Sequence, residues 1–297
     1  MNATAIRSEW LHTWWLAARP KTLAAGLVPV GLGTAIAYAH GGFRALPAIA
    51  ALIGAICIQI GTNLANDYFD ALKGADTADR KGPTRVTQAG MIRAEDVWSA
   101  SKLSFGLASL IGVYLVAEGG WPIVAIGIAS IAAGICYTGG PRPYGYHGLG
   151  DLFVFVFFGL VAVTATHYVQ TLWWSSQALL SSVAIGMLSV AILVVNNIRD
   201  MPTDQACGKR TLATRIGRKY SELEFDLMIF SPYAICVVQA WIIERPALVI
   251  PIVTLPLAIR VRSRLRSGEG SQLNEVLAQT AKLLSAFGLM LSIGWLL

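Results

Sequence analysis

The stretch ALLSSVAIGMLSVAILVVNNIRDMPTD, residues 178–204, decides the fold class. Residues 178–195 are apolar or small, and this run is close to the ~20 residues that a helix needs to cross a bilayer. A polar end with two asparagines and two aspartates follows at once. Carboxylates beside a membrane segment are costly, so they are candidates for function. The stretch therefore predicts a membrane helix with a functional end.

Long apolar segments recur along the whole chain. Of its 297 residues 55% are hydrophobic and only 13% are charged, and the mean hydropathy is +0.58. Soluble domains carry about 25% charged residues. The apolar runs do not alternate as the strands of a membrane barrel do. We therefore predict an all-α polytopic membrane protein, with one domain over residues 1–297.

Nine segments are predicted to span the membrane. They are 22–40, 46–65, 99–117, 121–139, 152–170, 178–197, 226–243, 246–261 and 280–297. With a cytoplasmic N-terminus, all but two of the 23 Lys and Arg residues fall on the cytoplasmic side. Only Arg44 and Arg245 lie opposite. This bias follows the positive-inside rule and predicts a plasma-membrane protein with its site open to the cytoplasm. The net charge of +6 thus reflects topology, and we expect no nucleic-acid partner.

A second polar end follows the apolar segment 46–65. Its acidic and amide residues are Asn66, Asp67, Asp70, Asp76 and Asp79. An alignment of Asn66 with Asn196 also aligns Asp70 with Asp200. We predict two pseudo-repeat half-sites, near 63–85 and 196–219, that face one central cavity beneath a cytoplasmic cap. The alternative is that Asn and Asp serve only as turn residues at helix ends.

Carboxylate and amide oxygens suit a hard cation such as Mg²⁺, which completes its shell with water and phosphate oxygens. Two such ions would clamp a diphosphate. The predicted metal ligands are Asn66, Asp67, Asp70, Asp76, Asn196, Asp200 and Asp204. On a helix the last three lie one turn apart on one face. Pro202 restricts that helix near its end, so Asp204 is expected to lie already in the loop.

Basic and aromatic residues near the clusters are candidates for binding phosphate and substrate. The predicted diphosphate-binding residues are Lys73, Arg142, Lys209 and Arg210. Basic side chains stabilise charge that develops on a departing diphosphate, although positive-inside topology also accounts for any one of them. The loop 137–151 is rich in Gly, Pro and Tyr and is predicted to face the substrate. The predicted substrate-binding residues are Arg19, Lys21, Asn63, Tyr144, Tyr146 and Asp151.

These motifs resemble those of the UbiA-type intramembrane prenyltransferases, which have nine helices. That family carries N-D-x-x-D after helix 2 and D-x-x-x-D after helix 6, and Asn66-Asp67-x-x-Asp70 and Asp200-x-x-x-Asp204 match. Gly74 stands where the first motif often has a further Asp, which leaves Asp76 and Asp79 as alternatives. The strings at 18–23, 66–76, 142–151 and 196–212 resemble the 1,4-dihydroxy-2-naphthoate prenyltransferase branch.

The resemblance implies an Mg²⁺-dependent enzyme with two ions and with Asp67, Asp70, Asp200 and Asp204 as catalytic residues. It implies polyprenyl diphosphate as donor and 1,4-dihydroxy-2-naphthoate as acceptor in a lipid bilayer. Prenylation with decarboxylation would give demethylmenaquinone for menaquinone biosynthesis. One alternative is prenylation of 4-hydroxybenzoate or another aromatic quinone precursor. A secondary transporter is the alternative from another class, and it would place its carboxylates at the bilayer centre.

Overall fold

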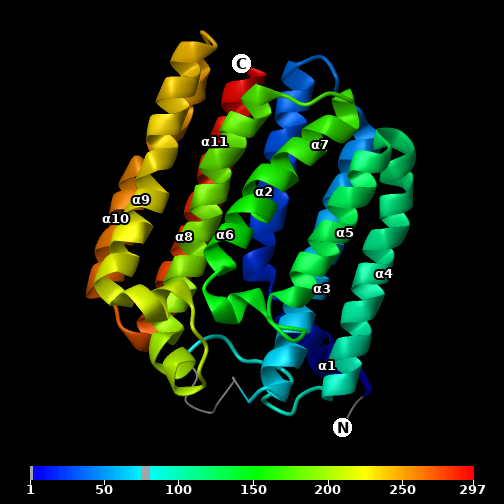
Figure 1. Cartoon of the computed structure of the whole chain (residues 1–297), viewed down its shortest axis with the longest axis vertical. Coiled ribbons are helices and arrows are strands. Elements are labelled where there is room, and N and C mark those ends of the chain that lie inside the picture. The colour runs from blue at the N-terminus through cyan, green and yellow to red at the C-terminus, as the bar shows by residue number, and fades with distance from the viewer. Residues whose placement is uncertain (1–2, 75–80) are drawn as a thin grey trace.

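The computed structural model describes residues 3–74 and 81–297, with side chains from residue 10 onward except that of Lys21. These residues form helices and connections, without a strand among them. Most helices run along the long axis of one bundle (Figure 1). The longer helices are α1 (Ala3–Ala18), α2 (Pro20–Ala39), α3 (Ala45–Leu72), α4 (Ala94–Gly119), α5 (Trp121–Cys136), α8 (Ser176–Ala206), α9 (Leu212–Ile242), α10 (Leu255–Ser267) and α11 (Leu273–Leu296).

Two spans are built from shorter pieces. The first joins α6 (Gly150–Val154), the π-helical η2 (Phe155–Val161) and α7 (Ala162–Thr171). The second joins the 3₁₀ helix η3 (Pro246–Thr254) to α10. Pro251 lies inside η3, and Pro256 lies in the first turn of α10. Proline has no backbone N–H to donate to an α-helix, which explains why this span starts as a tighter helix. The remaining 3₁₀ turns are η1 (Tyr144–His147) and η4 (Gly270–Gln272).

The prediction of a polytopic helical membrane protein is confirmed. Eight helical segments of the described chain are long and apolar enough to cross a membrane. The remaining predicted span, 121–139, corresponds to α5, a shorter apolar helix that packs against α3, α4 and α7. Each of the nine predicted segments thus coincides with a helix of the bundle. The protein is a multi-pass membrane protein.

The helices that carry the acidic clusters continue past the predicted spans. Helix α8 runs through Pro202 to Ala206, so Asp204 is helical and the expectation of a loop there is wrong. The region between the predicted spans 178–197 and 226–243 is also mostly helical, because α9 begins at Leu212 and has a kink at Gly217 (φ 78°, ψ 167°). Hydropathy marks where a chain leaves the apolar layer, whereas hydrogen bonding and packing decide where its helix ends.

Helix α3 ends beside its acidic cluster for a local reason. Lys73 is its C-cap, and Gly74 follows with φ +63°. A left-handed residue after the C-cap is a common helix stop, and glycine adopts it without a steric cost. Gly74 therefore ends the helix at the position where the resembled motif often continues with Asp.

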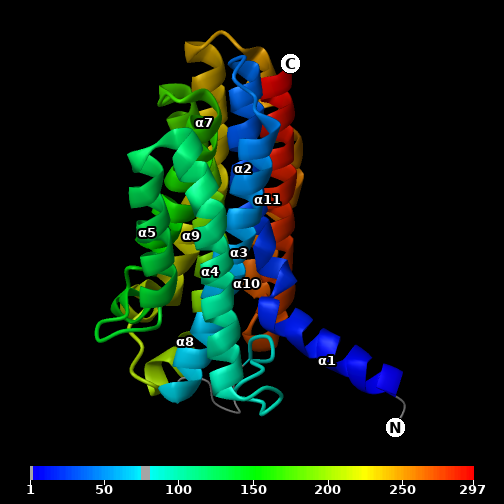
Figure 2. The same cartoon turned by 90° about the vertical axis from the view of Figure 1, so that its right-hand side faces the viewer.

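Helix α1 leaves the bundle at an angle near the end where α3 terminates (Figure 2). Its Trp10 and Trp15 side chains are about three-fifths exposed, at 59% and 60%. Tryptophan is enriched at membrane interfaces because its ring is apolar and its N–H is polar. These side chains fit a helix that lies along the membrane surface.

The π-helical segment brings two backbones into close contact. A Cβ placed on Gly159 of η2 would lie 2.5 Å from the Cα of Gly186 in α8. Glycine at both positions therefore lets η2 rest on α8, the helix that carries the second acidic cluster. This contact fixes α6 and α8 relative to each other.

We expect Gly159→Ala to destabilise the protein by about 1–3 kcal/mol, because the added methyl group forces the two backbones apart. Thermal unfolding in detergent measures the change. The matched control is Gly127→Ala in α5, where no heavy atom lies within 4 Å of the added Cβ. Its stability should be unchanged or slightly raised, since alanine favours helix. Equal unfolding temperatures for the two variants would contradict the close contact.

Candidate active site

The first acidic cluster lies on the last turns of α3. It binds residues of the connection between α3 and α4. The Asp67 carboxylate is 1% exposed and accepts hydrogen bonds from the backbone N–H groups of Val86 (3.2 Å) and Thr87 (3.3 Å). Asp70 accepts from Arg85 Nη2 at 2.9 Å and from the Tyr146 hydroxyl at 2.8 Å. Residues 81–93 and the α5–α6 connection therefore meet at this cluster.

The second acidic cluster lies on the last turns of α8. Arg199 donates to both carboxylate oxygens of Asp200, from Nε at 2.8 Å and from Nη2 at 2.7 Å. The same guanidinium donates to the Asn196 amide oxygen at 2.6 Å and to Asn274 Oδ1 of α11 at 2.9 Å. A bidentate pair with further hydrogen bonds is the geometry that makes a buried ion pair tolerable.

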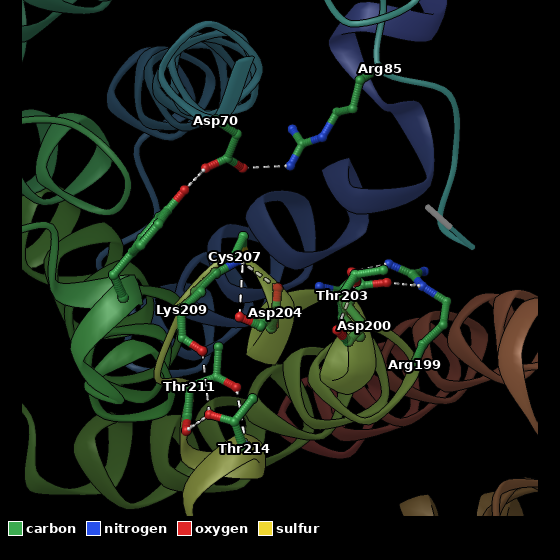
Figure 3. A network of polar contacts seen from close by, with 12 residues as sticks. Asp70, Arg85, Arg199, Asp200, Thr203, Asp204, Cys207, Lys209, Thr211 and Thr214 are labelled. Carbon is green, nitrogen blue, oxygen red and sulfur yellow. Dashed lines mark hydrogen bonds and ion pairs between the residues drawn. The ribbon is translucent and has the colours of Figure 1, made fainter. Parts of the chain in front are cut away.

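Asp204 differs from the other three aspartates. Its Oδ1 lies 3.5 Å from Lys209 Nζ, whereas its buried Oδ2 has no hydrogen-bond partner among the described residues. A buried oxygen without a donor costs free energy, so a further positive or hydrogen-bonding group is favoured there. In Figure 3 Asp204 lies between Lys209 and the Asp200–Arg199 pair, below Asp70.

Tyr146 connects the two clusters. The Nζ atoms of Lys73 and Lys209 lie 4.6 Å and 5.4 Å from the centre of its ring, and its hydroxyl donates to Asp70. Lys73 also donates to the Thr138 carbonyl oxygen. Burial lowers the pKa of the Lys73 ammonium, and the charge of Asp70 opposes that shift. The ring of Tyr146 thus contacts Lys73, which follows α3, and Lys209, which follows α8.

A basic pocket adjoins this ring. Its volume is about 480 Å³, and its polar lining comes from Lys73, Tyr146, His147, Arg210 and Arg215. Gly208 and the Gly140–Pro143 turn complete the lining without carboxylates. Cationic and N–H donors in a concave site suit phosphate oxygens. The pocket can therefore take an anion next to the aspartates.

The donor set fits a hard divalent cation. No group of three or more His, Cys, Asp or Glu side chains converges in the described part of the chain. Mg²⁺ does not require one, because it usually binds through one or two carboxylates together with phosphates and water. Asp67, Asp70, Asp200 and Asp204, with the amide oxygens of Asn66 and Asn196, supply oxygen ligands of that kind. In this structure Arg and Lys side chains balance the charge of three of these aspartates.

Comparison with known proteins agrees with this geometry. The model of the UbiA prenyltransferase family matches residues 26–294. The chain belongs to this family. It is 39% identical to a 1,4-dihydroxy-2-naphthoate octaprenyltransferase of Mycobacterium tuberculosis, across 87% of this chain and 88% of that protein. It is 42% identical to the Escherichia coli protein of the same name, across 69% of each chain.

A solved structure shares the fold. A UbiA homolog from Archaeoglobus fulgidus, bound to DMAPP and Mg²⁺, superposes with a TM-score of 0.65 at 12% identity, over 95% of this chain and 99% of that one. At that identity the match speaks for the fold alone.

Three predicted polar residues hold this end of the family fold together. Asn66 accepts a hydrogen bond from the Thr138 hydroxyl at 2.8 Å. Asn63 donates to the Ala18 carbonyl and to the Thr22 hydroxyl, both at 3.0 Å. Arg19, the residue before α2, lies next to that contact with a positive φ of 53°. The structure therefore brings Arg19 and Asn63 to the end of the bundle that carries the first cluster.

The other predicted residues make separate contacts or fall outside the described residues. The Tyr144 hydroxyl donates to the Ala133 carbonyl oxygen at 2.8 Å, and its ring stacks on Phe153 at 3.9 Å. Arg142 is exposed on the same connection. Asp76 and Asp79 lie outside the described residues, as does the Lys21 side chain. Asp151 is buried at the start of α6.

Two arginines of the site are not among the predicted binding residues. Arg85 and Arg199 each pair with a cluster aspartate, and their signal in the sequence is a basic residue close to an acidic cluster. Tyr137 belongs to the loop 137–151 that is predicted to face the substrate, and it is half-buried. A Cβ placed on Gly150 would lie 3.5 Å from its ring and 3.6 Å from its hydroxyl oxygen, so its ring lies against the start of α6.

We expect Tyr146→Phe to lower kcat/KM for the prenyl diphosphate about 10- to 100-fold, because Asp70 loses a hydrogen bond to a charged oxygen while the ring between the lysines remains. Steady-state kinetics with purified protein measures this. The control is Tyr168→Phe, which removes a hydroxyl that donates to Gly119 at 3.0 Å near Trp174. Equal kinetics for both variants would contradict a role of the Tyr146 hydroxyl at the site.

Proposed function

We propose that this member of the family transfers a polyprenyl group from polyprenyl diphosphate to 1,4-dihydroxy-2-naphthoate with loss of CO₂. One observation carries the proposal: two buried carboxylate clusters, each with its own cation, face a basic pocket through Tyr146. The names of the relatives at 39% and 42% identity support the choice of acceptor. The product belongs to menaquinone biosynthesis.

The two clusters would hold Mg²⁺, with one ion at each. Asn66, Asp67 and Asp70 are the ligands proposed for the first, with Asp76 beyond the described residues. Asn196, Asp200 and Asp204 are those proposed for the second. Bound Mg²⁺ neutralises a diphosphate and favours its departure. The Archaeoglobus structure with DMAPP and Mg²⁺ supports a divalent metal in this fold.

The basic residues bind the leaving diphosphate. Lys73, Lys209 and Arg210 lie around Tyr146 and the basic pocket, and Arg142 stands exposed on the neighbouring turn. Their charges are fixed before the C–O bond breaks, so they stabilise the growing negative charge without reorganisation. The rings of Tyr144 and Tyr146 and the polar groups of Arg19, Lys21, Asn63 and Asp151 are the proposed contacts for the organic substrates.

Prenylation and decarboxylation of the acceptor ring balance without a further reagent. The carbon that bears the acceptor carboxylate attacks the allylic cation, and a C–C bond forms. The bond to the carboxylate then breaks, and its electron pair restores the aromatic ring as CO₂ leaves. The immediate product is the quinol form of demethylmenaquinone. The helix bundle excludes water, which would otherwise capture the cation.

Two other activities agree with fewer of these observations. Prenylation of 4-hydroxybenzoate or another quinone precursor is the alternative within the family. A transporter is disfavoured because both clusters lie at helix ends on one side of the bundle (Figure 1), whereas transporter sites lie near the bilayer midplane.

We expect the purified protein in lipid, with Mg²⁺ and a labelled polyprenyl diphosphate, to prenylate dihydroxynaphthoate and release CO₂. Asp70→Ala and Asp200→Ala should each lower the rate by at least about 100-fold, as should EDTA, because the metal ligands are lost. The control is Asp226→Asn, an acid on α9 that pairs with Arg262 and Arg266. Full activity in both alanine variants would refute the metal clusters, and activity on 4-hydroxybenzoate alone would favour the alternative acceptor.

We also propose that the clusters face the cytoplasm from the plasma membrane, with the N-terminus inside. In a variant without native cysteines, a membrane-impermeant thiol reagent added to intact cells should label Ser176→Cys and spare Ser267→Cys. Both serines are exposed, at the start of α8 and at the end of α10. The reverse pattern of labelling would invert the topology.

A further inference from the structure

A second cavity lies apart from the basic pocket and shares no lining residue with it. Its volume is about 600 Å³, and it opens between α1 and the first turns of α4, where α1 diverges from the bundle (Figure 2). Its walls include Trp10 and Trp14 of α1, Met91 and Arg93 of the connection before α4, and Asp96 and Leu103 of α4. The proposed chemistry uses none of these residues, so the cavity is a candidate site for a different molecule.

The cavity lies where the protein meets the membrane surface. Trp10 and Trp15 are exposed on α1, as is typical of a helix at a membrane interface. On α4 the exposed Leu103 borders the cavity, and the exposed Leu107 and Leu110 continue the same helix face at i+4 and i+7. Exposed leucines on a membrane-spanning helix face lipid chains. The cavity is therefore continuous with the lipid-facing surface of α4.

The charged groups at the cavity form one ion pair. Arg93 donates from Nε to Asp96 Oδ2 at 2.9 Å and from Nη2 to Asp96 Oδ1 at 3.0 Å. The two side chains are 77% and 46% exposed. A guanidinium has five N–H donors and a carboxylate oxygen accepts more than one hydrogen bond, so both groups can also bind a ligand. The other described residues that line the cavity carry no charge.

This set of groups selects an amphiphile with a zwitterionic head. An anionic head would be attracted by Arg93 but repelled by Asp96, whereas a phosphate linked to an ammonium group is complementary to both. A primary ammonium also donates hydrogen bonds to Asp96 and to the hydroxyl of Ser99, another lining residue, and a quaternary ammonium has no N–H to donate. The apolar walls and the leucine face of α4 suit an acyl chain.

The connection that borders the cavity also reaches the first acidic cluster. The N–H of Met91 donates to the Val86 carbonyl oxygen at 2.9 Å, which closes a compact turn. On the other side of this turn the N–H of Val86 donates to Asp67, and Arg85 donates to Asp70. A ligand that packs against Met91 therefore stabilises the turn that binds these two aspartates.

We propose that the cavity between α1 and α4 binds a phospholipid with a phosphoethanolamine head. The phosphate contacts Arg93, the ammonium contacts Asp96, and one acyl chain follows the face of α4 that begins at Leu103. The bound lipid fills the space between the interfacial helix and the bundle and supports the connection over the first cluster. This inference does not depend on the proposed function, because lipid binding is measured without catalysis.

Native mass spectrometry of the purified full-length chain, titrated with dioleoyl phosphatidylethanolamine, measures the tightest lipid-binding event. Arg93→Gln/Asp96→Asn should weaken it about 5- to 20-fold, because two charge-assisted contacts at a partly exposed site are lost. The matched control is Arg44→Gln/Glu118→Gln, which removes an ion pair near the opposite end of α4 and should leave the affinity unchanged. Equal affinities of the two double variants would overturn the proposal.

A second variant and two further lipids test the place and the head group. Ser99→Trp puts a ring into the cavity from an exposed position and should also weaken binding at least about 5-fold. Dioleoyl phosphatidylglycerol and dioleoyl phosphatidylcholine should bind the wild type at least about 5-fold more weakly than phosphatidylethanolamine, and equal binding of the three lipids would overturn the proposal.

Thermal unfolding gives an independent measure of the same contact. Phosphatidylethanolamine should raise the unfolding temperature of the wild type in detergent, since a ligand of the native state stabilises it. The rise should be smaller in Arg93→Gln/Asp96→Asn and in Ser99→Trp. Unfolding temperatures near the wild-type value without added lipid show that both variants fold. An equal rise in the wild type and in both folded variants would place the lipid elsewhere.

Discussion

The arrangement at the functional end depends on the cost of burying negative charge. An unpaired buried carboxylate costs several kcal/mol, so the aspartates of α3 and α8 require cations and N–H donors around them. Arg85, Arg199 and Lys209 supply the cations, and the backbone at Val86 and Thr87 supplies N–H donors. The connections cover this end of the bundle because the carboxylates bind them there. Under the proposed function, a substrate anion with its metal ions would provide the same charge balance in another form.

The opposite end of the bundle is closed by neutral polar groups and rings. His40 hydrogen-bonds His167 at 2.9 Å and Gln177 at 2.8 Å, and its ring lies against Trp173 and Trp295. These contacts join α2, α7, α8 and α11 without buried acids. Charge is present at this end too, in the Arg44–Glu118 ion pair, but the buried aspartates of the described chain gather at the other end.

The sequence predicts what depends on composition and local spacing. Apolar runs locate the nine helices, and Asn and Asp at their ends locate both clusters. It fails where a distant contact decides the outcome. The end of α8 lies beyond Pro202 because the helix stays packed there, and Tyr146 reaches Asp70 across 76 positions of the chain.

The two clusters match in residue type but not in how their charge is balanced. Asp200 pairs with its chain neighbour Arg199, which α11 holds through Asn274, so this ion pair is built into the helices. Asp70 pairs with Arg85 from a connection 15 residues along the chain. The two predicted half-sites therefore differ in how they are held. The ion pair on α8 lies within the helices, whereas Asp70 on α3 is paired through one connection and accepts a hydrogen bond from Tyr146 of a second connection.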